Sequence, residues 1–195
     1  TDAYLADGEG VGTIVNDEQS ASGIFLRDGV LQVIGTDQRD SVSVRAVGSG
    51  ELSVSGSLVK NSKGQRFKLA DVTRIDIQLL GGNDSADIDR KLQTPVVIDG
   101  GAGDDKLRAG KGQAILWGGD GKDELYGGSG YSILVGGAGN DTLTAGSART
   151  ILIGGEGLGP PVVLAHELVA PRLETVDHVA IAGDLPAHAV TDDEF

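Results

Sequence analysis

Leucine recurs every nine residues through the middle of the chain, and Ile98 continues the series one step earlier. The six leucines are Leu107, Leu116, Leu125, Leu134, Leu143 and Leu152. Gly-Gly pairs begin every eighteen residues, at Gly100, Gly118, Gly136 and Gly154, and a half-step copy lies between each two pairs. A nine-residue period fits neither an α-helix nor a coiled-coil heptad.

The composition of the nine-residue unit explains its period. Six glycine-rich residues, which tolerate the positive φ of a tight turn, precede three residues that form a short strand with leucine at its centre. The leucine points inward and its two neighbours point outward. Two units then make one coil, and stacked coils about 4.8 Å apart form two short parallel sheets across a thin core. The pattern therefore predicts an all-β protein, a parallel β-roll or β-helix solenoid whose coils contact only their neighbours.

Three of the turns carry an aspartate at their sixth position. The pattern G-G-x-G-x-D-x-L stands at residues 100–107, 118–125 and 136–143. These motifs resemble the RTX (haemolysin-type) calcium-binding nonapeptide repeats of secreted bacterial proteins. The resemblance extends over residues 98–157, under a third of the chain.

The resemblance implies Ca²⁺ ions between successive turns on one side of the roll, held by sixth-position aspartates and by backbone carbonyls. Calcium suits such a site because it takes six to eight oxygen ligands in flexible geometry. The ligands expected by this analogy are Asp105, Asp123 and Asp141, with the carbonyls of Gly101, Gly103, Gly119, Gly121, Gly137 and Gly139. The alternative is a calcium-free solenoid in which these aspartates cap the amides of their own turns.

Two ions are expected, one between Asp105 and Asp123 and one between Asp123 and Asp141. Asp87 lies eighteen residues before Asp105 and is the candidate ligand for a third ion, although residues 81–87 fit the motif only loosely. A site beyond Asp141 lacks its partner because residues 154–159 contain no sixth-position aspartate.

The half-step turns differ from the motif, since Ala114, Ser132 and Thr150 stand where aspartate is expected. One edge of the roll therefore loses its carboxylates, and the expected ions form one row rather than two. The strands after these turns have apolar residues on both flanks, which predicts a sheet that is covered on both faces. The outward residues are Ile115, Trp117, Ile133, Val135, Ile151 and Ile153. We expect residues 160–182 to cover them, with a second copy in a homodimer or a neighbouring domain as alternatives.

The remaining chain divides by composition. Residues 1–22 are rich in glycine and acid and are expected to be flexible. Short β-like runs recur in residues 23–98, which predicts an irregular β region stacked on the roll of residues 99–159. Pro160 and Pro161 mark the start of a C-terminal cap and tail, residues 160–195.

Charge and missing motifs exclude several function classes. Twenty-nine acidic residues against sixteen basic ones give a net charge of −13, which opposes binding to nucleic acid or to anionic membrane surfaces and favours cations. No apolar stretch is long enough for a membrane span. The chain has no cysteine nucleophile or thiolate metal site. His166-Glu167 is not followed by the second histidine of a zinc-protease helix, and no G-x-S-x-G elbow occurs.

We therefore expect a non-enzymatic, secreted or cell-surface protein that binds calcium and folds on binding it. Its predicted role is structural or adhesive. The alternative is an accessory RTX module of an extracellular polysaccharide-active or proteolytic enzyme. A third interpretation is carbohydrate binding through Trp117 and Tyr126 on an exposed sheet.

Overall fold

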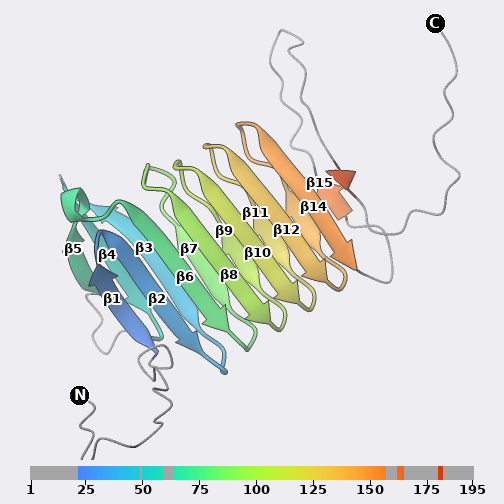
Figure 1. The fold of residues 1–195 in the computed structure, drawn as a ribbon, viewed down its shortest axis with the longest axis horizontal. Coiled ribbons are helices and arrows are strands. Elements are labelled where there is room, and N and C mark those ends of the chain that lie inside the picture. Colours follow the sequence, from blue (N-terminus) through green and yellow to red (C-terminus); the bar gives the residue numbers. More distant parts are fainter. Residues whose placement is uncertain (1–21, 49, 59–63, 157–161, 165–179, 182–195) are drawn as a thin grey trace, which may run out of the picture.

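The computed structural model shows an elongated row of stacked coils (Figure 1) and describes residues 22–48, 50–58, 64–156, 162–164 and 180–181. In this part of the chain the regular structure is β, apart from a 3₁₀ turn, η2 (Leu69–Asp71). The strands are β1 (Gly23–Arg27), β2 (Val30–Thr36), β3 (Ser41–Val47), β4 (Glu51–Gly56), β5 (Gln65–Lys68), β6 (Arg74–Leu80), β7 (Ser85–Ile88), β8 (Val96–Ala102), β9 (Lys106–Arg108), β10 (Ala114–Asp120), β11 (Glu124–Tyr126), β12 (Ser132–Ala138), β13 (Thr142–Thr144), β14 (Thr150–Glu156), β15 (Val162–Leu164) and β16 (Ala180–Ile181). The same part of the chain contains no helix long and apolar enough to cross a membrane.

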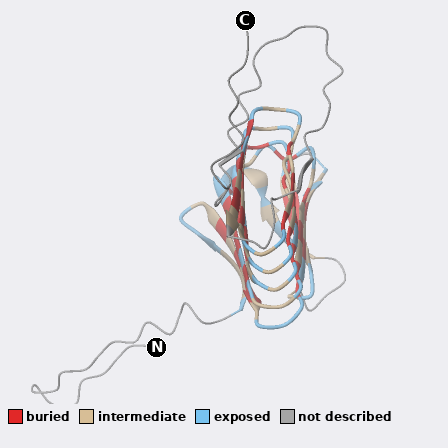
Figure 2. Ribbon diagram, turned by 90° about the vertical axis from the view of Figure 1, so that its right-hand side faces the viewer, coloured by how far each residue is buried: buried red, intermediate tan, exposed pale blue. Residues whose placement is uncertain are grey.

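The strands form two sheets that lie face to face as thin layers (Figure 2). Sheet A has the order β1-β2-β6-β8-β10-β12-β14-β16, and sheet B has the order β15-β13-β11-β9-β7-β3-β4-β5. The chain alternates between the sheets from β6 onward, so each pair of strands completes one coil. The predicted parallel β-solenoid is therefore confirmed.

The register of the strands repeats every eighteen residues in the centre of the roll. In sheet A, Leu116 pairs with Leu134, and in sheet B, Leu125 pairs with Leu143. Parallel pairing at this step places each leucine directly above the corresponding residue of the coil before it. The nine-residue leucine period of the sequence is thus the half-coil of the fold.

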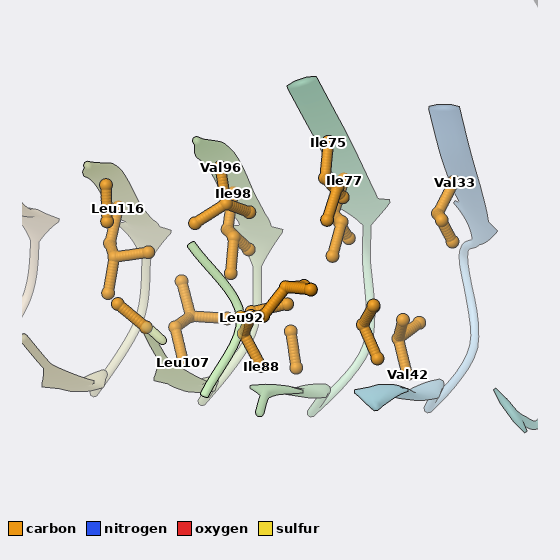
Figure 3. Packing of buried hydrophobic residues seen from close by; sticks show 14 of the residues in the cluster. Val33, Val42, Ile75, Ile77, Ile88, Leu92, Val96, Ile98, Leu107 and Leu116 are labelled. Atoms are coloured by element: carbon orange, nitrogen blue, oxygen red, sulfur yellow. The ribbon is translucent and has the colours of Figure 1, made fainter. Parts of the chain in front are cut away.

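The core consists of aliphatic side chains that face one another from the two sheets (Figure 3). Leu107 and Leu125 of sheet B and Leu116 and Leu134 of sheet A are fully buried. A thin core of this kind gains its stability from contacts between neighbouring coils rather than from a globular interior.

The sharp turns need glycine because successive coils approach very closely there. Gly119 has a φ of +113°, which L side chains rarely adopt, and a β-carbon added to it would lie 1.9 Å from the carbonyl oxygen of Gly101 in the preceding coil. A side chain at this position would force the coils apart.

The irregular N-terminal region belongs to the same solenoid. β2 pairs in parallel with β6, and β3 pairs in parallel with β7, while β1, β4 and β5 add antiparallel strands at this end. The connection from β7 to β8 is longer than those of later coils, and it inserts Leu92, 1% exposed, into the core (Figure 3).

The outer face of sheet A carries the expected apolar stripe. Trp117 is 41% exposed and Ile151 is 37% exposed, and both alternate along their strands with buried leucines. Near the starts of these strands lies a groove of about 590 Å³, lined in part by Val97, Ile115 and Ile133.

The last coil continues the solenoid in both sheets. β15 pairs with β13, and β16 pairs with β14 through Leu152 and Ala180. Most of residues 160–182, which we expect to cover the stripe, lies outside the described residues, so that expectation stays a prediction. The division of the chain at residues 22, 98 and 159 likewise stays a prediction.

Val135→Asp tests whether the stripe is covered. Val135 is half-buried between Trp117 and Ile153 of the neighbouring strands, so a carboxylate there loses both cross-strand contacts. We expect the free energy of unfolding in saturating calcium to fall by about 1 kcal/mol or more. If a second copy covers the stripe, the mass in light scattering should also halve. Val135→Thr, which keeps the shape, is the control, and an unchanged melting temperature and mass for Val135→Asp would refute the prediction.

Candidate metal centre

One edge of the roll, here called the aspartate edge, consists of the turns at residues 35–40, 79–84, 100–105, 118–123 and 136–141. Each turn leads from a strand of sheet A to a strand of sheet B. The turns are equivalent because Thr36 pairs with Leu80, Gly101 pairs with Gly119, and Gly119 pairs with Gly137. Each of these turns ends in an aspartate.

The terminal aspartates are joined into a continuous ladder along the roll. In each step the backbone N–H of one aspartate donates to Oδ1 of the aspartate in the next coil. These distances are 2.7 Å from Asp40 to Asp84, 2.7 Å from Asp84 to Asp105, 2.8 Å from Asp105 to Asp123 and 3.0 Å from Asp123 to Asp141. The carboxylates of Asp84, Asp105, Asp123 and Asp141 therefore follow one another along the edge, and each accepts an aspartate amide through its Oδ1.

The second oxygens of the central carboxylates are buried without a partner. Asp105 is 2% exposed and Asp123 is fully buried, and neither Oδ2 atom accepts a hydrogen bond; the same holds for Oδ2 of Asp84. A buried carboxylate oxygen that lacks a donor carries a large desolvation cost. These oxygens are suited to a cation.

In the three repeat turns, the first glycine lies so close to the carboxylate that no side chain would fit there. A β-carbon on Gly100 would lie 2.3 Å from Oδ2 of Asp105 and 2.5 Å from the carbonyl oxygen of Gly118. At Gly118 the corresponding distances are 2.3 Å to Oδ2 of Asp123 and 2.4 Å to the carbonyl oxygen of Gly136. Carboxylate and carbonyl oxygens thus meet inside each turn, and these are the hard ligands that calcium prefers.

The glycine carbonyls predicted as ligands lie in two rows along the same edge. Those of Gly101, Gly103, Gly119, Gly121 and Gly137 each lie close to a glycine of the next coil: a β-carbon on Gly121 would lie 2.3 Å from the Gly103 oxygen, and one on Gly137 would lie 2.1 Å from the Gly119 oxygen. In the described part of the chain, no three His, Cys, Asp or Glu side chains gather into one metal-binding group. An ion at this edge must therefore take most of its ligands from the backbone.

Burial raises the pKa of the Asp105 carboxyl to about 6. Repulsion from the carboxylates of Asp84, Asp104 and Asp99 adds to this effect, whereas the hydrogen bond from the Asp84 amide opposes it. The protein alone thus stabilises the negative charge of Asp105 less well than water does.

The pKa of Asp123, the next carboxyl along the ladder, is shifted further. Burial raises the pKa of Asp123 to about 7, and the charges of Asp141, Asp105 and Asp104 add to the shift. Burial also raises the pKa of Asp84 and Asp141. These four carboxylates therefore favour protons or another cation.

Asp40 ends the ladder differently, because protein groups satisfy both of its oxygens. Its Oδ2 accepts from the amide of Thr36 at 2.7 Å and from the Thr36 hydroxyl at 2.9 Å, and its Oδ1 accepts from the Ser57 hydroxyl at 2.6 Å. This end of the ladder needs no ion.

The register expected for Asp87 is wrong, because Asp84 takes the ladder position instead. Asp87 lies on the outer face of β7, forms an ion pair with Arg45 and is in register with Arg108. Asp84 and Asp105 are 21 residues apart, whereas the later ladder aspartates are 18 apart. Counting back eighteen residues missed the three additional residues of this coil. The tripeptide Gly-Asn-Asp, present at residues 82–84 and again at 139–141, is the signal that identifies the correct position.

The opposite edge lacks carboxylates at the corresponding positions. Ala114, Ser132 and Thr150 are buried there, and the two hydroxyls bond to their own turns: Ser132 Oγ donates to the Gly130 carbonyl and Thr150 Oγ1 to the Ala148 carbonyl. These turns close without an external ligand.

Trp117 and Tyr126 do not share a surface. Trp117 lies on β10 of sheet A and Tyr126 on β11 of sheet B, so they cannot form one stacking platform for a sugar. Lys106 and Arg108 also lie over the Tyr126 ring, at 5.3 and 4.9 Å from its centre.

The central coils match a known family of repeats. Residues 96–116 and 117–152 match the model of the RTX calcium-binding nonapeptide repeat (4 copies). No curated protein and no solved structure matches the chain. The RTX resemblance is thereby confirmed: residues 96–152 are a calcium-binding repeat module, and the matched segment contains Asp105, Asp123 and Asp141 but not Asp84.

Without calcium, the roll should lose stability as the pH rises. The folded pKa values of Asp105 and Asp123, about 6 and about 7, lie above the ordinary value of 3.8, so the folded state holds more protons than the unfolded state between these limits. The free energy of unfolding should therefore decrease from pH 4 to pH 7. Because the roll is expected to lose order without calcium, far-ultraviolet circular dichroism in chelator across this range measures the effect as the fraction of the roll that stays ordered. Asp123→Asn should flatten the dependence, and stability that increases over the same range would contradict the account.

Proposed function

Starting from the RTX calcium-binding repeats at residues 96–152, we propose that this protein is a calcium-dependent structural module whose roll becomes ordered when ions occupy the aspartate edge. The observation that carries the proposal is the set of buried, unpartnered carboxylate oxygens inside glycine turns that also present carbonyl oxygens. The residues proposed to hold the ions are Asp105, Asp123 and Asp141, together with turn carbonyls.

The physical role of the ion follows from the ladder. Two carboxylates about 4.8 Å apart repel by about 3 kcal/mol at an effective dielectric constant of 20. A divalent cation reverses the sign of this interaction and supplies the missing partner of Oδ2 in Asp105 and Asp123. Because the unfolded chain has no such site, the free energy of binding becomes free energy of folding.

Removal of calcium should disorder the roll. We expect the β signal in far-ultraviolet circular dichroism to decrease in millimolar EDTA and to return when calcium exceeds the chelator. Magnesium at the same concentration serves as the control, because it demands a more rigid octahedral site and sheds water reluctantly. A spectrum that is the same in EDTA and in calcium would refute coupled folding.

Asp123→Ala should remove more than one ion. Asp123 lies between Asp105 and Asp141 in the ladder, so it is shared by both expected sites. Asp120→Ala is the matched control: Asp120 is exposed in the same turn, and alanine occupies its position in both neighbouring coils, at Ala102 and Ala138. Calorimetric titration should show loss of ions for Asp123→Ala only. Equal ion counts in the two variants would count against the ladder.

We further propose that the module is secreted or exposed at a cell surface, with a structural or adhesive role. The support is the RTX repeat itself and the net charge of −13, which suits a cation-rich environment. In calcium-poor surroundings the repeats would remain unfolded and would fold after export. Extracellular calcium modules have dissociation constants of about 10⁻⁴–10⁻³ M, and we expect the same range here. Binding below about 10⁻⁷ M would instead indicate a module that works at cytosolic calcium.

A further inference from the structure

The turn at residues 79–84 lies outside the recognised repeats but has the conformation of a calcium turn. Leu80 has a φ of +71°, where its register partner Gly101 has +97°, and Gly82 has +124°, where Gly103 has +123°. Among described residues other than glycine, only Asp28 shares a positive φ with Leu80. A leucine in this conformation is held there by the surrounding structure, and such positions concentrate at functional sites.

The backbone oxygens of this turn continue the two carbonyl rows. A β-carbon on Gly101 would lie 2.0 Å from the Leu80 oxygen, and one on Gly103 would lie 1.8 Å from the Gly82 oxygen. In the recognised repeats, β-carbons on Gly119 and Gly121 would lie 1.9 and 2.3 Å from the oxygens of Gly101 and Gly103. One coil later, β-carbons on Gly137 and Gly139 would lie 2.1 and 1.8 Å from the oxygens of Gly119 and Gly121. The backbones of the turns at residues 79–84 and 100–105 therefore approach each other as closely as those of neighbouring recognised repeats do.

The carboxylate of this turn is in the same state as those of Asp105 and Asp123. Asp84 is 3% exposed, and its Oδ1 accepts the amide of Asp40, while its Oδ2 is buried without a partner. Its amide donates to Oδ1 of Asp105 at 2.7 Å. The Asn83 side chain also accepts the amide of Asp104 at 3.2 Å, which fixes the two turns together.

From these observations we infer a third calcium site, between Asp84 and Asp105, which uses the carbonyls of Leu80 and Gly82. The inference rests on the proposed function of the neighbouring turns. Leu79, which is fully buried, stands where the repeats have Gly100 and Gly118, so this turn lacks the close approach of glycine to the carboxylate oxygen that the repeats show. The third site should therefore be the weakest of the row.

The row should end at this site. The next carboxylate, that of Asp40, is fully hydrogen-bonded by Thr36 and Ser57 and has no oxygen left to offer. The irregular N-terminal coil thus provides a calcium-independent end onto which the ion-dependent coils stack.

The test is the number of bound calcium ions in the full chain, measured by calorimetry and native mass spectrometry. The wild type should bind three ions along the row, and Asp84→Asn should bind one fewer, because asparagine keeps the acceptor for the Asp40 amide but loses the charge. Asp87→Asn is the matched control: Asp87 lies three residues later, faces outward toward Arg45, and its variant should keep all the ions.

The outcomes separate this inference from the proposed function. If the wild type binds no calcium, the proposed function fails and the third site fails with it. If Asp123→Ala loses ions but Asp84→Asn loses none, only the third site is overturned. If Asp84→Asn does not fold, the wild-type count decides, since two ions or fewer contradict the third site and three support it.

Discussion

The structure depends on aspartate carboxylates, all of the same charge, that are stacked along one edge of a thin solenoid. The hydrogen bond from each aspartate amide to the carboxylate of the next coil sets the register of the turns, and the same bond brings buried carboxylates one above another. The hydrogen bond that orders the coils therefore also brings negative charges together. The protein offers no partner to the second oxygens of Asp84, Asp105 and Asp123, so it does not relieve this repulsion. A bound divalent cation removes this conflict, because it turns the repelling oxygens into shared ligands.

The turns at the two edges of the roll are stabilised in different ways. At the aspartate edge the turns need glycine to bring carbonyls and carboxylates together, and they leave oxygens unpartnered. At the opposite edge Ser132 and Thr150 bond to carbonyls of their own turns, so these turns close independently of any ion. The proposed calcium dependence is in this way confined to one side of the molecule.

Much of this architecture could be predicted from the sequence because the central coils are regular. The spacing of Leu107 to Leu152 revealed the half-coil, and the three motifs placed Asp105, Asp123 and Asp141 in one row. The prediction failed where the coil length changes: the connection that buries Leu92 adds three residues, and this shifted the third candidate from Asp84 to Asp87. Hydrogen bonds between distant residues, such as that from Ser57 to Asp40, have no signature in the local pattern. The nine-residue period assigns Trp117 and Tyr126 to different half-coils, so it already argues against the shared sheet that the carbohydrate interpretation assumed.

The most direct test of the account is a crystal structure of the full chain grown with calcium, with anomalous difference density used to locate the ions. The account predicts peaks in a single row along the aspartate edge, between neighbouring carboxylates from Asp84 to Asp141. It predicts no peak beside Ala114, Ser132 or Thr150. An aspartate edge without density at saturating calcium, or ions at the opposite edge, would contradict it.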